Sequence, residues 1–224
     1  MNYLSHFYFD QSTNRPEFAL GLILPDLVHS HNKNWVIKPE KNLLLYEGSE
    51  KDIYLGWQKH KLIDKIFHGS EFFKLKTAII KDSIQIAFSQ SPVWSFFLAH
   101  ITLELSLDSL LISEGKIGVE SFYSILEKVD RKTLMKFFVL NKVQEPESFL
   151  FYLDEFLSSG YLSRYEIAAE LTYPLDRICY KIWKERFTAD QNICLRETIL
   201  NFCYQNKVDF MEIFQFIESQ LLKS

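Results

Sequence analysis

Residues 56–64 read Gly-Trp-Gln-Lys-His-Lys-Leu-Ile-Asp, and this stretch indicates the fold class. His60 and Asp64 are four residues apart, so in a helix their side chains lie on one face, about one turn from each other. A titratable pair on the buried side of an amphipathic helix costs free energy unless a partner satisfies it. A divalent metal is one such partner, and a hydrogen bond from a neighbouring helix is another. The apolar residues on or beside the same face are Ile53, Trp57, Ile63 and Phe67.

The composition agrees with a helical fold. The chain has 224 residues, of which 47% are hydrophobic, and only seven are Gly and six are Pro. So few turn-forming residues disfavour a β-sandwich or a disordered chain, while twenty Phe and eleven Tyr supply large apolar groups for a core. We therefore predict an all-α, single-domain helical bundle over residues 1–224. The periodicity is weak around residues 29–50, where we expect a long loop.

Prolines mark the expected helix ends. Asn14 and Pro16 predict a helix start, and Pro25 should end or kink that helix, which places Asp26 at a helix break. Pro92 should precede a very apolar helix that reaches about Ile112.

Charge and composition also exclude some functions. The net charge of −4 disfavours general nucleic-acid binding. No run of about 18 apolar residues lacks polar breaks, so we predict no transmembrane helix. The first residues lack the features of a signal peptide. The three cysteines are odd in number and widely spaced, which is typical of reduced thiols, and we expect a cytoplasmic protein.

All the histidines lie in the first hundred residues, which suggests one polar site built from that half: His6, His29, His31, His60, His68 and His100. In the helix after Pro92, His100, Glu104 and Asp108 follow at intervals of four and form one stripe. Imidazole and carboxylate on adjacent turns are a workable pair of metal ligands. A second polar stripe, on the opposite face, comprises Ser95, Thr102, Ser106 and Ser109.

Each of these residues also has a purely structural interpretation. His60 and Asp64 can share a structural hydrogen bond, and the His100 stripe can face water. Asp26 can cap a helix, and His6 can be a hydrogen-bonded core residue. The other histidines fit a surface loop (His29 and His31) or a helix end, where a cationic imidazole suits the helix dipole (His68).

Several short segments are each common, but their combination and order are more specific. In order, they are Met-Asn-Tyr-Leu-Ser-His (1–6), Gly-Leu-Ile-Leu-Pro-Asp (21–26), His-Lys-Leu-Ile-Asp (60–64), Phe-Leu-Ala-His (97–100) and Tyr-Leu-Ser-Arg-Tyr (161–165). Together they resemble the acyl carrier protein phosphodiesterase family, over most of the chain. That family is similar to the HD-type metal phosphohydrolases, which are all-helical. Its members use a divalent cation such as manganese to release 4′-phosphopantetheine from a serine of acyl carrier protein.

The family resemblance and the spacing of the histidines and carboxylates together predict a metal site and a protein partner. We predict a cation, Mn²⁺ by resemblance, held by His6, Asp26, His60, Asp64 and His100. Asp64 or Glu104 would orient or deprotonate the attacking water. Acyl carrier protein is acidic, so its docking surface should be basic. Two sets of side chains can form such a basic surface: Lys59, Lys61, Lys65, Lys74 and Lys76, or Arg177, Lys181, Lys184 and Arg186.

Two departures from the family pattern bear on activity. Leu22 stands where the family usually has Asn, and Ala99 stands where it usually has an acidic residue. Loss of that carboxylate would abolish activity if it is a ligand or base, unless Glu104 or Asp108 replaces it. Two alternatives therefore stay open. One is a non-catalytic relative that binds a carrier protein or a phosphorylated ligand. The other is a hydrolase of another phosphodiester, such as a phospholipid head group or a nucleotide.

Overall fold

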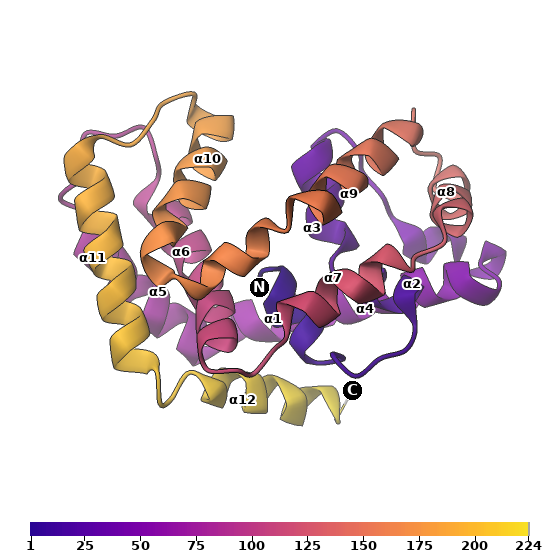
Figure 1. The fold of residues 1–224 in the computed structure, drawn as a ribbon, viewed down its shortest axis with the longest axis horizontal. Helices are drawn as coiled ribbons and strands as arrows, with labels where there is room; N and C mark the ends of the chain where they lie inside the picture. The colour runs from indigo at the N-terminus through magenta and orange to yellow at the C-terminus, as the bar shows by residue number, and fades with distance from the viewer. Residues whose placement is uncertain (224) are drawn as a thin grey trace. The chain divides into compact units, whose positions relative to one another are not determined.

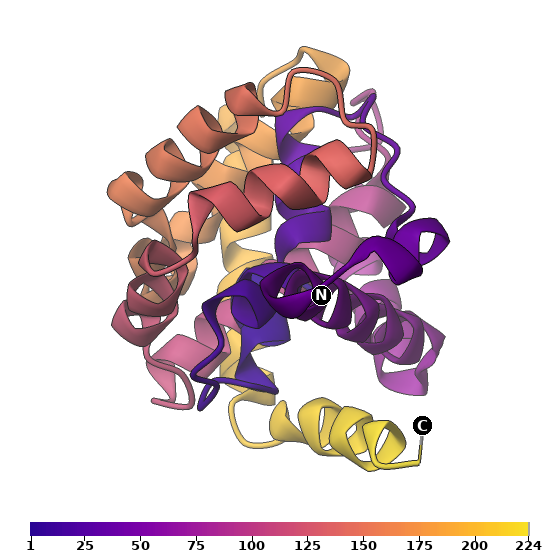
Figure 2. The ribbon, with the colours of Figure 1, turned by 90° about the vertical axis from the view of Figure 1, so that its right-hand side faces the viewer.

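The computed structural model describes residues 1–223, and every regular element in that range is a helix. Figure 1 labels the helices, and the turned view in Figure 2 likewise draws no strand among the described residues. The predicted all-α class is confirmed. The cysteines Cys179, Cys194 and Cys203 are free thiols, as expected.

The contacts divide the described chain into two compact units, each built from two separate segments. The first unit comprises residues 1–64 and 117–161, and the second comprises 65–116 and 162–223. The predicted single-domain organisation stays a prediction.

The first unit packs short helices against the first three-quarters of a long one. Helix α7 contacts α1, α2 and α9, while α3 contacts α2 and α9. Fully buried apolar side chains, among them Leu4, Leu20 and Phe122, accompany these contacts. Its elements are α1 (Tyr3–Tyr8), α2 (Pro16–Gly21), α3 (Leu24–His31), η1 (Pro39–Leu45), α4 (Gly48–Gly69) as far as Asp64, α7 (Val119–Glu127), α8 (Arg131–Leu140) and α9 (Glu147–Ser159).

The second unit is centred on the apolar helix α6. Helices α5, α10 and α11 all contact α6, as does the short helix η3. Its elements after the last turn of α4 are α5 (Glu71–Ile84), α6 (Ser95–Ser113), η2 (Tyr161–Glu166, from Leu162 onward), η3 (Ala168–Leu171), α10 (Thr172–Trp183), α11 (Ala189–Asn206) and α12 (Met211–Leu221).

Helices α2 and α4 approach each other backbone to backbone at two glycines. A Cβ placed on Gly21 would lie 2.3 Å from the carbonyl oxygen of Ile53, and one on Gly56 would lie 2.2 Å from that of Phe18. Only glycine fits at both positions, because any side chain would overlap the facing backbone. This crossing lies one residue before Leu22 and one turn before His60.

Residues 29–50 are more ordered than the predicted long loop. Helix α3 continues to His31, and η1 occupies Pro39–Leu45. The buried Tyr46 then donates a hydrogen bond to the Pro39 carbonyl (3.1 Å) and stacks on Phe137 of α8. The weak periodicity reflects a 3₁₀ segment fixed by one aromatic anchor, which has no 3.6-residue repeat.

Helix α6 buries part of each of its polar stripes. Asp108, Thr102 and Ser106 are fully buried, so neither stripe is a solvated face along its whole length. By length and hydropathy alone, α6 is the single helix in residues 1–223 that could cross a membrane. Since 61% of that window is buried inside the structure, this is weak evidence for a membrane span.

Candidate metal centre

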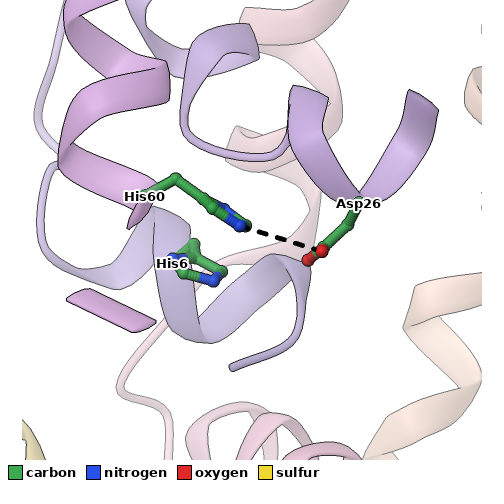
Figure 3. A group of neighbouring side chains, drawn as sticks. All are labelled: His6, Asp26 and His60. Atoms are coloured by element: carbon green, nitrogen blue, oxygen red, sulfur yellow. Dashed lines mark ion pairs between the residues drawn. The ribbon is translucent and has the colours of Figure 1, made fainter. Parts of the chain in front are cut away.

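Three helices of the first unit bring His6, Asp26 and His60 together (Figure 3). His6 lies in the last turn of α1, Asp26 in the first turn of α3, and His60 in α4. One ligand atom from each side chain lies within 4.8 Å of the other two. Asp64, one turn after His60, contacts both imidazoles: its Oδ1 is 3.2 Å from His6 Nε2 and its Oδ2 is 3.3 Å from His60 Nε2.

Asp26 is placed by a helix break at a slightly different position from the expected one. The helix that begins at Pro16 ends at Gly21, and α3 begins at Leu24, so Pro25 lies in the first turn of the new helix. A proline is well tolerated there because the first N–H groups of a helix have no partner within it. Asp26 therefore projects from the positive end of α3, which favours its ionised form.

The tautomer of His60 follows from one hydrogen bond. Its Nδ1 lies 2.8 Å from the carbonyl oxygen of Leu22, and a carbonyl only accepts, so Nδ1 carries the proton. Nε2 then faces Asp26 Oδ1 at 3.8 Å and Asp64 Oδ2 at 3.3 Å. The main chain of Leu22 makes this contact, so it does not depend on the side chain at position 22. Metal-bound histidines are commonly oriented by such a bond from the other ring nitrogen.

The charges around His60 change its titration. Burial alone would lower its pKa, but Asp26 and then Asp64 raise that pKa above the ordinary value. A protonated Nε2 would satisfy these carboxylates in the metal-free protein. A divalent cation at the same place would satisfy these carboxylates instead of the proton.

His6 is fully buried and stacks on the His60 ring, with the centroids 3.8 Å apart. Burial, and then the nearby charge of His60, lower the pKa of His6 to about 3. It is therefore neutral at physiological pH. Within residues 1–223, its Nδ1 accepts or donates no hydrogen bond, which is uncommon for a buried polar atom.

Asp64 stays ionised despite being largely enclosed. Burial acts to raise its pKa, but the Met1 amino group and the contacts with His6 and His60 hold that pKa well below its usual range. The Met1 nitrogen lies 2.7 Å from Asp64 Oδ1. Asp64 therefore links three positively polarised groups.

This donor set suits a divalent cation. Two imidazoles and a carboxylate are ligands of Zn²⁺, Mn²⁺ and Fe²⁺, and all three side chains are already gathered before any ion binds. The prediction that the chain carries a possible metal-binding group is confirmed at this level, while the identity of the ion stays a prediction.

The other two predicted residues, His100 and Glu104, belong to a second group, in the second unit. They lie on α6 and contact His68 in the last turn of α4. The predicted convergence of His100 with His60 stays a prediction. The sequence places His68 at a helix end, and it does not predict these contacts. The available signal was its spacing, because His60, Asp64 and His68 follow at intervals of four, as His100, Glu104 and Asp108 do.

The first unit also has a hollow, which lies at a different place from these side chains. It measures about 580 Å³ and is open to solvent between residues 11–16 and α7. None of the predicted site residues lines it. The convergence of ionisable groups has a chemical consequence, whereas no histidine or aspartate among the described residues lines the hollow.

No family model, no curated protein and no solved structure matches the chain.

Proposed function

We propose that this protein is a metal-dependent phosphodiesterase whose cation is held by His6, Asp26 and His60. The observation that carries the proposal is the convergence of these side chains from three helices, with a fully buried His6 whose Nδ1 has no partner among the described residues. A core built only for stability would not gather two imidazoles and two carboxylates, since each costs free energy to desolvate. Binding of a cation would offset that cost.

Each side chain has a separate role in this proposal. His60 presents Nε2, because Nδ1 is committed to Leu22, and the neutral His6 can offer a lone pair. A divalent cation supplies Lewis acidity toward phosphoryl oxygens and makes a water molecule more acidic. Asp64, held ionised with 29% of its side chain exposed, accepts hydrogen bonds and orients a water molecule. Its lowered pKa makes it a weak proton acceptor, so we assign it a positioning role.

The substrate part of the proposal rests on the sequence segments that resemble the acyl carrier protein phosphodiesterases. Holo-acyl carrier protein is the first substrate to test. Lys61 is exposed on α4, directly after His60, and suits an acidic partner. We expect Lys61→Glu to raise KM for holo-acyl carrier protein without changing hydrolysis of bis(p-nitrophenyl) phosphate. Lys51→Glu, at an exposed position nearer the start of α4, is the matched control.

The direct test is mass spectrometry of holo-acyl carrier protein after incubation with chelator-treated enzyme and added Mn²⁺. We expect loss of the phosphopantetheine mass with wild type, and no loss with Asp26→Asn, which keeps the side-chain shape but removes the anionic ligand. Asp154→Asn, at a 62% exposed side chain on α9, should retain activity. No hydrolysis of this substrate or of bis(p-nitrophenyl) phosphate with Mn²⁺, Mg²⁺, Fe²⁺ or Zn²⁺ would contradict the proposal.

One observation favours a second candidate, a non-catalytic relative that binds a carrier protein or a phosphorylated ligand. Ala99 has no carboxylate and is fully buried in α6, where the family usually has an acidic residue. Binding of holo-acyl carrier protein by wild type, without turnover under any of the four cations, would support this candidate.

A further inference from the structure

His68, His100 and Glu104 place three ligand atoms in a tight triangle within the second unit. The two Nε2 atoms are 3.0 Å apart, and Glu104 Oε1 lies 3.2 Å from His68 Nε2 and 2.8 Å from His100 Nε2. His68 comes from the last turn of α4, and the other two come from successive turns of α6. No residue is shared with the group around His60.

Protons alone do not satisfy this triangle while Glu104 is ionised. A contact between two imidazole nitrogens is favourable only if one of them carries hydrogen. The nitrogen without hydrogen then turns its lone pair toward the carboxylate oxygen, which is also an acceptor. If both nitrogens carry hydrogen, their N–H groups repel each other. One of the three close contacts is therefore unfavourable in every arrangement of protons.

A cation removes this conflict, because it accepts all three lone pairs. Two ligands about 2.1 Å from one ion lie roughly 3.0 Å apart at a right angle and roughly 3.4 Å apart at a tetrahedral angle. The three distances of the triangle are close to this range. We propose that His68, His100 and Glu104 form a second divalent-cation site, which takes an ion of the Zn²⁺ class.

The surrounding rings hold the ligands in place. Phe73 of α5 packs edge-on against both imidazoles, with its centroid 4.9 Å from that of His68 and 5.1 Å from that of His100. Ser70 fixes the turn between α4 and α5: its Oγ donates to the Phe67 carbonyl and accepts from the Phe73 N–H. This packing means that little ordering remains to be done when an ion binds.

Partial exposure gives the site access to solvent. The side chains of His68 and His100 are 33% and 27% exposed, and that of Glu104 is 14% exposed. Two histidines and one glutamate leave at least one coordination position of Zn²⁺ for water or a substrate oxygen, as in zinc hydrolases with the same ligand set. The site therefore takes an ion that keeps an exchangeable position, in contrast to a closed structural site.

The experiment follows each histidine in the wild-type protein, so it does not depend on a variant that folds. Diethyl pyrocarbonate modifies accessible imidazoles, and peptide mass spectrometry locates each product. At a Zn²⁺ concentration well above Kd, we expect modification of His68 and His100 to slow by roughly ten- to a hundred-fold, while the exposed His29 on α3 keeps its rate. Unchanged rates at His68 and His100 would overturn the proposal.

A variant series separates this site from the proposed active centre. Equilibrium dialysis with Zn²⁺ should show that Glu104→Gln loses one bound equivalent, whereas Glu71→Gln, at an 89% exposed carboxylate on α5, loses none. Asp26→Asn should leave protection of His68 and His100 intact. Retention of every equivalent by Glu104→Gln would contradict the second site. Loss of protection in Asp26→Asn would show that the two groups are one site.

Discussion

At the residue scale, His6 and His60 differ in protonation although their rings are stacked. The pKa of His60 is raised because two carboxylates face its Nε2, which outweighs burial. The pKa of His6 is lowered to about 3 because burial is complete and His60 brings a like charge. One ring is therefore ready to hold a proton and the other to offer a lone pair.

This difference predicts a pH dependence of stability in the metal-free protein. An unfolded His6 binds its proton near pH 6.5 and the folded one only near pH 3, so the unfolded state binds more protons between these values. The free energy of unfolding should therefore fall as pH drops from about 6.5 toward 3, by at most about 1.4 kcal/mol per pH unit from this residue. Urea unfolding at several pH values in the presence of a chelator measures it.

The matched variant for that series is His6→Gln, which has no titrating group. His60, Asp26, Asp64 and the Met1 amino group also titrate around this position, so only the difference between the two proteins isolates His6. We expect His6→Gln to have the flatter curve below pH 6.5. Parallel curves would show that His6 is protonated in the folded protein.

Ala99 gives a second prediction at this scale. Replacing it with Asp would introduce a carboxylate beside His100, but Ala99 is fully buried. We expect Ala99→Asp to destabilise the protein by about 2 kcal/mol or more, because a buried carboxylate loses its hydration. Ala78→Asp, at an exposed position of α5, should cost less than about 1 kcal/mol. Thermal melts with and without Mn²⁺ decide this, and an unchanged Tm for Ala99→Asp would indicate that a partner for the carboxylate already exists.

Some of the site residues were predictable and others were not. His60 and Asp64 follow from an i, i+4 spacing on an apolar helix, which is local information. His6 and Asp26 lie on other short helices, so their contact with His60 depends on packing that no spacing encodes. The clustering of histidines and the break at Pro25 singled them out, but only the family resemblance placed them beside His60. His68 sits at the end of α4, where a favourable helix-dipole interaction was a sufficient explanation for a histidine.

At the element scale, the crossing of α2 and α4 positions the candidate metal centre. Gly21 and Gly56 let the two backbones meet, and this contact holds the Leu22 carbonyl within 2.8 Å of His60 Nδ1. We expect Gly56→Ala to destabilise the protein by about 1–3 kcal/mol or more, because its Cβ would overlap the Phe18 carbonyl. It should also weaken Mn²⁺ binding, since the helices must separate. Denaturant unfolding and calorimetry measure the two effects.

Gly69→Ala is the control for that change, because Gly69 belongs to the same helix but a Cβ added there would meet no atom within 4 Å. Gly69 also lacks the positive φ that would strain an alanine. The substitution should be neutral or stabilise the protein by up to about 1 kcal/mol. Equal destabilisation by both substitutions would mean that helix α4, and not its crossing with α2, is sensitive.

Element boundaries show why periodicity was only partly informative. Proline placed a helix break near Asp26, as expected, but the break precedes Pro25 because proline suits the first turn of α3. Each polar stripe of α6 is buried over part of its length, so the polar pattern alone does not mark a solvated face. A pattern that assigns every polar residue to the surface would wrongly predict that the buried residues Asp108 and Thr102 are exposed.

At the scale of the whole molecule, α4 is one continuous helix whose residues contribute to both units, with the boundary between Asp64 and Lys65. The all-α class was predictable from composition, since it depends on the sum of many residues. The division into two interleaved units was not, because its boundary inside α4 has no loop, glycine or proline to mark it, although glycines lie near the other two boundaries. The residues of the two candidate ligand groups fall on either side of this boundary in the sequence, and Asp64 and His68 are four residues apart along one helix.

The last prediction concerns how a cation at the first group changes stability. Its ligands lie on α1, α3 and α4, so opening any of these helices releases the ion. At an Mn²⁺ concentration of about 100 times Kd, binding adds about 2.7 kcal/mol, which at this chain length raises Tm by roughly 5–10 °C. Amide exchange in residues 3–8 and 24–31 should slow in parallel. Asp26→Asn should remove both effects, while Asp154→Asn keeps them. A Tm rise that survives Asp26→Asn would place the responsible ion elsewhere in the chain.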